Sequence, residues 1–255
     1  MRSLSRALHS ELLKLRRTLA LRLTVVAPLV IAGLCFLFFY KGITSGRNVG
    51  GGNMPVWTSL CQQALILWSL LMMPLFIALE TALLAGLEHQ EKNWKLLYTQ
   101  PVPRWTIYAA KQLTGMGLIA LSVLTFWALI LLAGFTLHLL LPDAGFGKDV
   151  PWLRLLKYCG FLYLASGSLL SLHTWVALRW HSFVVAMTVG IAGTVAASLV
   201  MYSDWNRYYP WTAPLLVANG FGAGKLLTST ILFGAVGGLV IAFLGAWDLG
   251  RREVG

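Results

Sequence analysis

The sequence is poor in charge, and above all in acidic charge. Of its 255 residues only 11% are Asp, Glu, Lys or Arg, and 58% are hydrophobic. Soluble domains carry about 25% charged residues, so this chain has too few for a surface that faces water all round. We therefore predict a polytopic membrane protein, with no room for a soluble catalytic domain and no catalytic residues.

Residues that bind metals or form disulfides are also scarce. Cys35, Cys61 and Cys159 all lie in apolar stretches, and we expect them to be small packed hydrophobic residues. The five histidines never stand at a ligand spacing such as His-x-x-x-His, so we expect no metal and no cofactor in this chain. No small-residue cleavage site follows the first apolar run, so we expect no signal peptide.

Long apolar runs are the dominant feature that is present. About 20 apolar residues cross a bilayer as a helix, and the chain holds six such runs. We predict an all-α protein in which residues 19–255 form a single transmembrane domain. The expected spans are residues 19–40, 56–79, 113–141, 158–178, 183–202 and 226–247.

The first 18 residues have the pattern of an amphipathic helix. One face carries an apolar stripe of Leu4, Leu8, Leu12, Leu15 and Leu19. The opposite, polar face carries Arg6, Ser10, Lys14 and Arg17. Such a helix lies in the plane of the lipid head groups, so we predict that residues 1–18 are interfacial. A basic flank without helical structure is the alternative.

The basic residues are distributed unequally between the two sides of the membrane. Thirteen of the 20 Lys and Arg residues fall on the side that holds both termini and the loop between the second and third spans. Positive charge favours the cytosolic side, so we predict that both termini are cytosolic. Because the basic residues stand at span ends, we expect them to contact anionic lipid rather than nucleic acid.

Two features of the sequence predict unusual packing, an interrupted apolar segment and a small-residue face on each of two spans. Residues 203–225 are too apolar for a water-exposed loop and too interrupted for a span, so we expect short re-entrant or interfacial helices packed against protein. Small residues recur on one face of two spans, where they permit close helix contact, either within the chain or between two copies. They are Ala186, Gly190, Gly193 and Ala197 on the fifth span, and Gly234, Gly238 and Gly245 on the sixth.

The segment from Glu80 to Lys111 is the internal loop that combines charge with amphipathic pattern. As a helix, residues 88–98 place Leu87, Trp94, Leu97 and Tyr98 on one face and Glu88, Glu91, Lys92 and Lys95 on the other. Pro101 and Pro103 end that helix because neither nitrogen can donate a hydrogen bond. The pattern suits a helix that fills a groove on another protein, although a solvated loop between two spans is the other interpretation.

This segment resembles a known motif. Glu88-x-x-Glu91-Lys92-x-Trp94-Lys95-Leu96-Leu97, followed by Pro101-Val102-Pro103-Arg104 and Lys111, is similar to the cytosolic loop of ABC transporter permeases of the type-2 (ABC-2 type) exporter family. In that family the loop carries the coupling helix that docks on the ATPase subunit. The resemblance implies that the contact with the ATPase is made or transmitted by Glu88, Glu91, Trp94, Lys95, Leu97, Pro101 and Arg104.

Further expectations follow from the resemblance. It implies an elbow helix before the first span, short external helices before the last, and a location in the bacterial cytoplasmic membrane. The partners it implies are ABC ATPase subunits, which hold ATP and magnesium, and a second permease copy, identical or paralogous. The family places the second and fifth spans beside the translocation path, for which the candidates here are Trp68, Met72, Phe76 and His173.

Three polar features need their own interpretation. His173 is mid-span, where a hydrogen bond to a neighbouring helix is the alternative to a role in transport. Glu80 stands near the cytosolic end of the second span and is expected to be hydrated or paired with a base such as Arg104 or Arg179. Residues 219–225 superficially resemble a phosphate-binding loop, but Leu226 replaces the Ser or Thr that would bind magnesium, so we expect no nucleotide site.

The function predicted on these grounds is that of an ATP-driven exporter's permease, which moves an amphipathic or hydrophobic molecule such as a peptide antibiotic, a drug or a lipid-like compound. An ion-gradient-driven transporter or channel is one alternative, and would need paired intramembrane carboxylates or broken helices. A membrane scaffold that anchors a cytosolic partner is the other.

Overall fold

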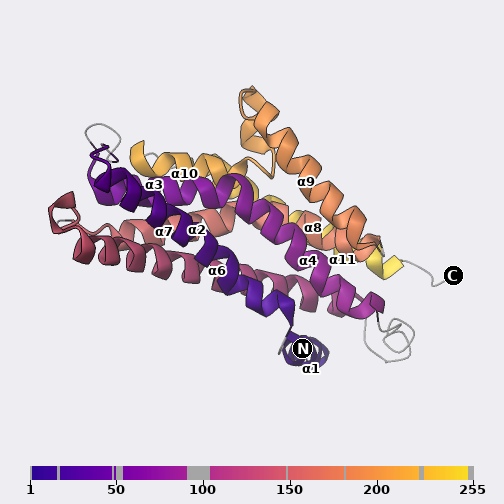
Figure 1. Ribbon diagram of the computed structural model, residues 1–255. Helices are drawn as coiled ribbons and strands as arrows, with labels where there is room; N and C mark the ends of the chain where they lie inside the picture. Colours follow the sequence, from indigo (N-terminus) through magenta and orange to yellow (C-terminus); the bar gives the residue numbers. More distant parts are fainter. Residues whose placement is uncertain are drawn as a thin grey trace.

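The computed structural model describes residues 2–15, 18–47, 49, 54–90, 104–147, 149–180, 182–223 and 227–251. Within these ranges the chain forms helices and no strand. Figure 1 shows the long helices lying lengthwise beside one another, with α1 viewed end-on across one end of the bundle. The prediction of an all-α membrane protein is confirmed.

The described helices account for most of the chain. The α-helices are α1 (Arg2–Leu15), α2 (Leu19–Thr44), α3 (Val56–Leu67), α4 (Met73–Gln90), α6 (Arg104–Leu140), α7 (Trp152–Ala165), α8 (Gly167–Arg179), α9 (Phe183–Val200), α10 (Ala213–Ala223) and α11 (Thr228–Arg251). A π-helical turn, η1 (Trp68–Met72), joins α3 to α4, and two 3₁₀ turns are η2 (Pro142–Ala144) and η3 (Asp204–Tyr208).

Side-chain caps fix where two of the spans begin. The hydroxyl of Thr18 accepts a hydrogen bond from the backbone N–H of Leu21 at the start of α2, and that of Ser182 accepts one from Val185 at the start of α9. Both caps satisfy N–H groups that a helix leaves without an internal partner. The first and fifth predicted spans therefore begin within a residue of the positions expected.

Within the described part of the chain, five helical stretches are long and apolar enough to cross a membrane, and a sixth candidate is bent. The five are Leu19–Thr44, Val56–Gly86, Trp105–Leu140, Phe183–Val200 and Thr228–Arg251. The sixth consists of α7 and α8, which meet at an angle of 41°. The fourth predicted span, residues 158–178, is therefore bent between Ala165 and Gly167. At 37 residues α6 is about 55 Å long, well beyond the roughly 30 Å of a hydrocarbon core.

The bend between α7 and α8 is the place where α11 packs most closely. A Cβ on Gly238 would lie 2.6 Å from the backbone carbon of Gly167, and one on Gly167 would lie 2.8 Å from the carbonyl oxygen of Gly234. No side chain fits between these backbones. The small residues Gly234 and Gly238 of the sixth span thus serve packing within the chain.

The small face of α9 also packs within the chain. Ala186, Gly190, Gly193 and Ala197 are all buried. A side chain on Gly190 would overlap Ala78 of α4 and touch His173 of α8, and one on Gly193 would overlap the indole of Trp211. Of the two interpretations left open for this face, the structure therefore supports contact within one chain.

The segment before the last span turns back into the bundle. Helix α10 packs on α3, α7 and the π-helical turn η1, which lies halfway along the second span. Tyr158 donates a hydrogen bond to the carbonyl of Gly220 at 3.0 Å, and Arg154 donates one to that of Phe221, so the C-terminal carbonyls of α10 have partners. The prediction of short helices packed against protein is confirmed, and residues 219–223 are the last turn of α10.

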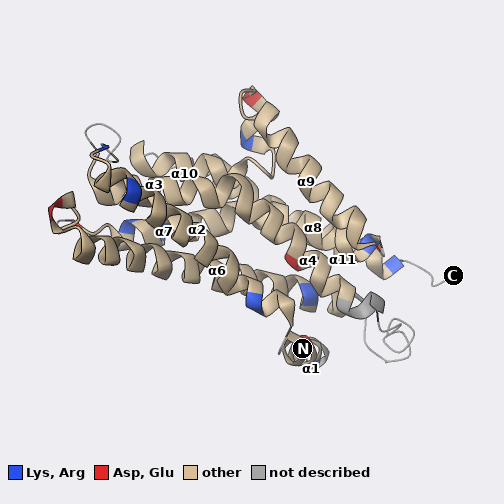
Figure 2. Cartoon of the chain, in the orientation of Figure 1, with Lys and Arg blue, Asp and Glu red and all other residues tan. Residues whose placement is uncertain are grey.

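Charge is confined to the ends of the bundle, and the length between is almost free of it (Figure 2). α1 and the C-terminal end of α11 lie at the same end (Figure 1). Helix α1 packs against α6. Because Leu12 and Leu13 are exposed while Leu15 is buried, its apolar residues divide between α6 and the surroundings.

Candidate functional site

The predicted ATPase-contacting segment connects the C-terminal end of α4 to the N-terminal end of α6. The backbone is helical up to Gln90 and again from Arg104. Glu91, Trp94, Lys95, Leu97 and Pro101 lie outside the described residues, as do the side chains of Glu88 and Arg104. The structure therefore describes how this segment is anchored at both ends, and the roles of its side chains stay predictions.

An ion pair joins α1 to α6 within two turns of the N-terminal end of α6. The ammonium group of Lys111 lies 3.1 Å from Oε2 of Glu11 and donates a second hydrogen bond, of 3.0 Å, to the carbonyl oxygen of Leu84 on α4. The other carboxylate oxygen of Glu11 lies 3.2 Å from Nζ of Lys14. Lys111 is 2% exposed and Glu11 is 5% exposed. One buried cation thus contacts three helices.

Sequence reasoning missed this ion pair. Lys111 was counted among the basic residues that face the cytosol, and Glu11 was not singled out. A signal was present, because a helix of 3.6 residues per turn places Glu11 on the same face as Leu8 and Leu15. An acidic residue within an apolar stripe needs a buried partner, since leaving a charge unpaired in an apolar environment is costly. The partner itself was not predictable, because it is 100 residues away in the chain.

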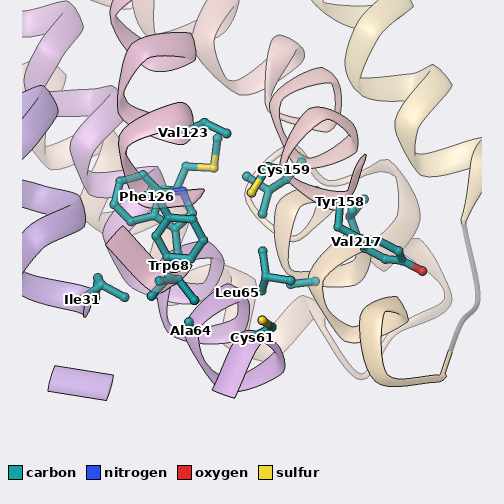
Figure 3. Close-up of a cluster of buried hydrophobic side chains, with 14 of the residues drawn as sticks. Ile31, Cys61, Ala64, Leu65, Trp68, Val123, Phe126, Tyr158, Cys159 and Val217 are labelled. Carbon is teal, nitrogen blue, oxygen red and sulfur yellow. The ribbon is translucent and has the colours of Figure 1, made fainter. Parts of the chain in front are cut away.

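Of the candidate translocation residues, three lie in or beside the π-helical turn of the second span. Trp68 is the first residue of that turn and Met72 the last. Trp68 stacks on Phe126 of α6 with ring centroids 5.2 Å apart, and Phe76 lies 6.1 Å from it. Figure 3 shows the indole of Trp68 against Phe126 inside a cluster of buried side chains. Trp68 and Phe76 therefore pack in the hydrophobic core of this conformation.

His173 is fully buried where α8, α9 and the turn before α10 meet. Its ring packs edge-on against Trp211, with centroids 5.5 Å apart. Neither ring nitrogen has a hydrogen-bond partner among the described residues, and the same is true of the indole nitrogen of Trp211. The alternative interpretation, a hydrogen bond to a neighbouring helix, is thus not observed. Trp211 had not been singled out from the sequence.

Glu80 is buried rather than hydrated. Its side chain is inaccessible, and neither carboxylate oxygen has a hydrogen-bond partner within the described part of the chain. Of the two bases considered as partners, Arg179 lies over the ring of Trp180 at 5.9 Å, and the side chain of Arg104 lies outside the described residues. Among the described residues no group of three His, Cys, Asp or Glu could hold a metal ion.

An apolar cavity of about 400 Å³ lies between α6, the α7–α8 bend and α11. It extends along α6 from Trp105 to Met116, which is the half of that helix nearest α1. Small residues of α11, including Ala242 and Ala246, make the room. None of its described lining residues is charged, and none of the four candidate translocation residues lines it. The cavity thus lies between other spans than the second and fifth.

The family model for "ABC-2 family transporter protein" matches residues 7–197, about three quarters of the chain. The chain belongs to the ABC-2 transporter family. A comparison with curated proteins finds no significant match.

As an ABC-2 family member the chain is a multi-pass membrane component of an ABC transporter, and the family implies association with ABC ATPase partners. The matched region includes α1 from residue 7 onward, the segment between α4 and α6, and both halves of the bent fourth span. The resemblance noticed in residues 88–111 is therefore confirmed at the level of the family.

Proposed function

We propose that this chain is the permease subunit of an ATP-driven exporter, in which separate ATPase subunits supply the energy through the segment between α4 and α6. The observation that carries the proposal is the family match over residues 7–197, which includes this whole segment. In sequence the segment has the amphipathic pattern of a docking helix, with Trp94 and Leu97 on one face. Buried aromatic side chains dominate the energetics of such contacts.

Two features of the fold support transmission from this segment. It joins α4 and α6 directly, and each belongs to a long span: α6 has 37 residues, and α4 continues through η1 into α3. A displacement of the segment must therefore move the ends of two spans. ATP-driven closure of the ATPase subunits would push on Trp94 and Leu97, and α4 and α6 would carry that movement toward the opposite end of the bundle.

The apolar cavity supports the proposed substrate class. Its volume of about 400 Å³ lies within the 300–1,000 Å³ typical of ligand pockets. Because the described lining carries no charged side chain, an apolar or amphipathic molecule suits it better than an ion or a sugar. The cavity lies beside the half of α6 nearest α1, the end that the sequence predicts to be cytosolic, so we propose that the substrate enters from the cytosolic leaflet.

The test is co-purification with a co-expressed ABC ATPase subunit. We expect Trp94→Ala with Leu97→Asp to abolish co-purification while the protein stays in the membrane, because both apolar anchors are lost. Lys92→Ala with Leu96→Asp makes matched changes on the opposite face of the predicted helix and should retain the ATPase. Equal recovery of ATPase with both double variants would contradict the proposed coupling role.

A gradient-driven transporter is the second candidate function. Two observations favour it, the buried Glu80 and the bent fourth span, because such transporters use intramembrane carboxylates and broken helices. Vesicles containing this chain alone separate the candidates. Substrate flux that follows a proton or sodium gradient without ATPase would support the second function. Flux that needs ATP and the ATPase supports the first, and the absence of both would favour a scaffold.

A further inference from the structure

We infer that Lys111 is a positioning residue that fastens α1 to α4 and α6, so that the three helices move as one unit when the segment between α4 and α6 is pushed. The movement itself rests on the proposed function. The fastening does not, because it depends only on contacts within the chain.

The geometry makes Lys111 the meeting point of three elements that are far apart in sequence. It lies two turns into α6, and its ammonium group binds the carboxylate of Glu11 on α1 at 3.1 Å and the carbonyl of Leu84 on α4 at 3.0 Å. Helix α1 packs along α6 rather than along α4. Among the described contacts, this ammonium group provides a polar connection between α1 and α4.

Burial allows this ion pair to fix the relative position of the helices. Two charges at 2% and 5% exposure cannot exchange their partners for water without a large cost in solvation. Apolar contacts between helices allow sliding, whereas a hydrogen-bonded ion pair fixes the relative position of its partners, and this is the best-attested use of buried ionic groups. An apolar cluster of Leu15, Ala20, Leu84 and Leu118 surrounds the joint, and Leu84 belongs both to it and to the polar contact.

The position of the joint relates it to coupling. Leu84 precedes the last described residue of α4 by less than two turns, and Lys111 follows the start of α6 by two turns. Both ends of the proposed coupling segment are thus attached to α1 close to where force would enter. If the ends were free to separate, part of that force would be lost in splaying α4 from α6.

The substitution Lys111→Met isolates the role of the charge. It keeps the length and apolar stem of the side chain, and Glu11 keeps Lys14 as a partner, so no buried charge is left unpaired. Lys111→Arg is the conservative variant, because a guanidinium group can donate to both a carboxylate and a carbonyl. Lys14→Met is the matched control, since it removes the other, more exposed partner of the same carboxylate.

The measurement is the distance between spin labels on α1 and α4, made by pulsed electron paramagnetic resonance in lipid nanodiscs. The labels are attached through Leu12→Cys, which is exposed, and Gly86→Cys, where a Cβ meets nothing within 4 Å. Protein without these two substitutions controls for labelling of Cys35, Cys61 and Cys159, which are buried. Samples are compared without nucleotide and, with the ATPase bound, after trapping with ATP and vanadate.

We expect one narrow distance distribution in both states for the native Lys111, for Lys111→Arg and for Lys14→Met. Lys111→Met should broaden the distribution roughly twofold, because α1 and α4 then sample separate arrangements, while the melting temperature of the protein changes little. If the distance distribution of Lys111→Met stays as narrow as that of the native protein and keeps the same mean distance, the inference is overturned. If Lys111→Met fails to fold, Glu11→Gln tests the same joint, and an unbroadened distribution there would equally overturn it.

The same experiment tests the proposed function separately from the fastening role of Lys111. If the ATPase does not bind the protein with native Lys111, the coupling role fails, but the nucleotide-free distances still decide whether Lys111 fastens α1 to α4.

Discussion

Trp211 occupies the space that a side chain on Gly193 would need. The indole lies against the backbone of α9 at Gly193, and the hydroxyl of the neighbouring Tyr209 donates a 3.0 Å hydrogen bond to the carbonyl oxygen of that same glycine. Tyr209 and Trp211 stack on each other with centroids 5.2 Å apart. The turn that leads into α10 is thus held against the middle of the fifth span.

This contact predicts that Gly193→Ala destabilises the protein. The new methyl group would overlap the indole of Trp211, which would have to move together with the stacked Tyr209. Overpacking of this kind costs about 1–3 kcal/mol. The measurement is thermal unfolding in detergent, in which size-exclusion chromatography monitors the loss of folded protein. Gly117→Ala is the control, because a Cβ there meets nothing within 4 Å, and similar midpoints for both variants would refute the prediction.

A larger effect is expected at Gly234, where α11 packs on the bend of the fourth span. A methyl group there would overlap the backbone of Ala165, and backbone cannot turn aside as an indole can. Gly234→Ala should therefore lower the unfolding midpoint further than Gly193→Ala does, through separation of α11 from α7 and α8. Gly237→Ala, whose nearest neighbour is the Cβ of Ser168 at 3.8 Å, should be tolerated. The order of midpoints decides the prediction, and a midpoint for Gly234→Ala equal to that of Gly237→Ala would contradict it.

The hydrogen bond between Gln112 and Ser171 predicts a measurable coupling between α6 and α8. The amide nitrogen of Gln112 donates to the hydroxyl oxygen of Ser171 at 2.8 Å, and both side chains are buried. Hydrogen bonds between membrane helices average about 0.6 kcal/mol in double-mutant cycles. Unfolding of Gln112→Leu, Ser171→Ala and the double variant should give a coupling energy of that order. Strict additivity of the two single effects would mean that this contact contributes nothing to stability.

Much of the architecture could be predicted because membrane insertion imposes simple rules. Apolar runs of about 20 residues locate spans without any knowledge of their neighbours. The interrupted apolar segment around Pro210 and Pro214 was recognisable as short helices packed against protein, since backbone groups away from water must be satisfied within the protein. The small faces of α9 and α11 were visible too, but periodicity does not say whether a second copy, Trp211 or the bend at Gly167 fills them.

The candidate site was less predictable. The amphipathic pattern of residues 88–98 and its family resemblance could be read directly, because both are local. The pairing of Glu11 with Lys111 could not be predicted, because 100 residues separate them and the residues around one carry no information about the other. The bend between α7 and α8 carries no proline, and the apolar cavity beside it depends on how three separate helices fit together.

By itself, then, the sequence determined that this chain enters a membrane as helices, which stretches do so, and which segment between Glu80 and Lys111 resembles a site of force transfer. Those properties follow from hydropathy and helical periodicity, which are summed over neighbouring residues. Only the tertiary structure decided that the buried ammonium group of Lys111 holds α1, α4 and α6 together. It also decided that Trp211 fills the space beside Gly193. Such contacts depend on the distance between side chains from remote parts of the chain, and that distance exists only once the helices have packed.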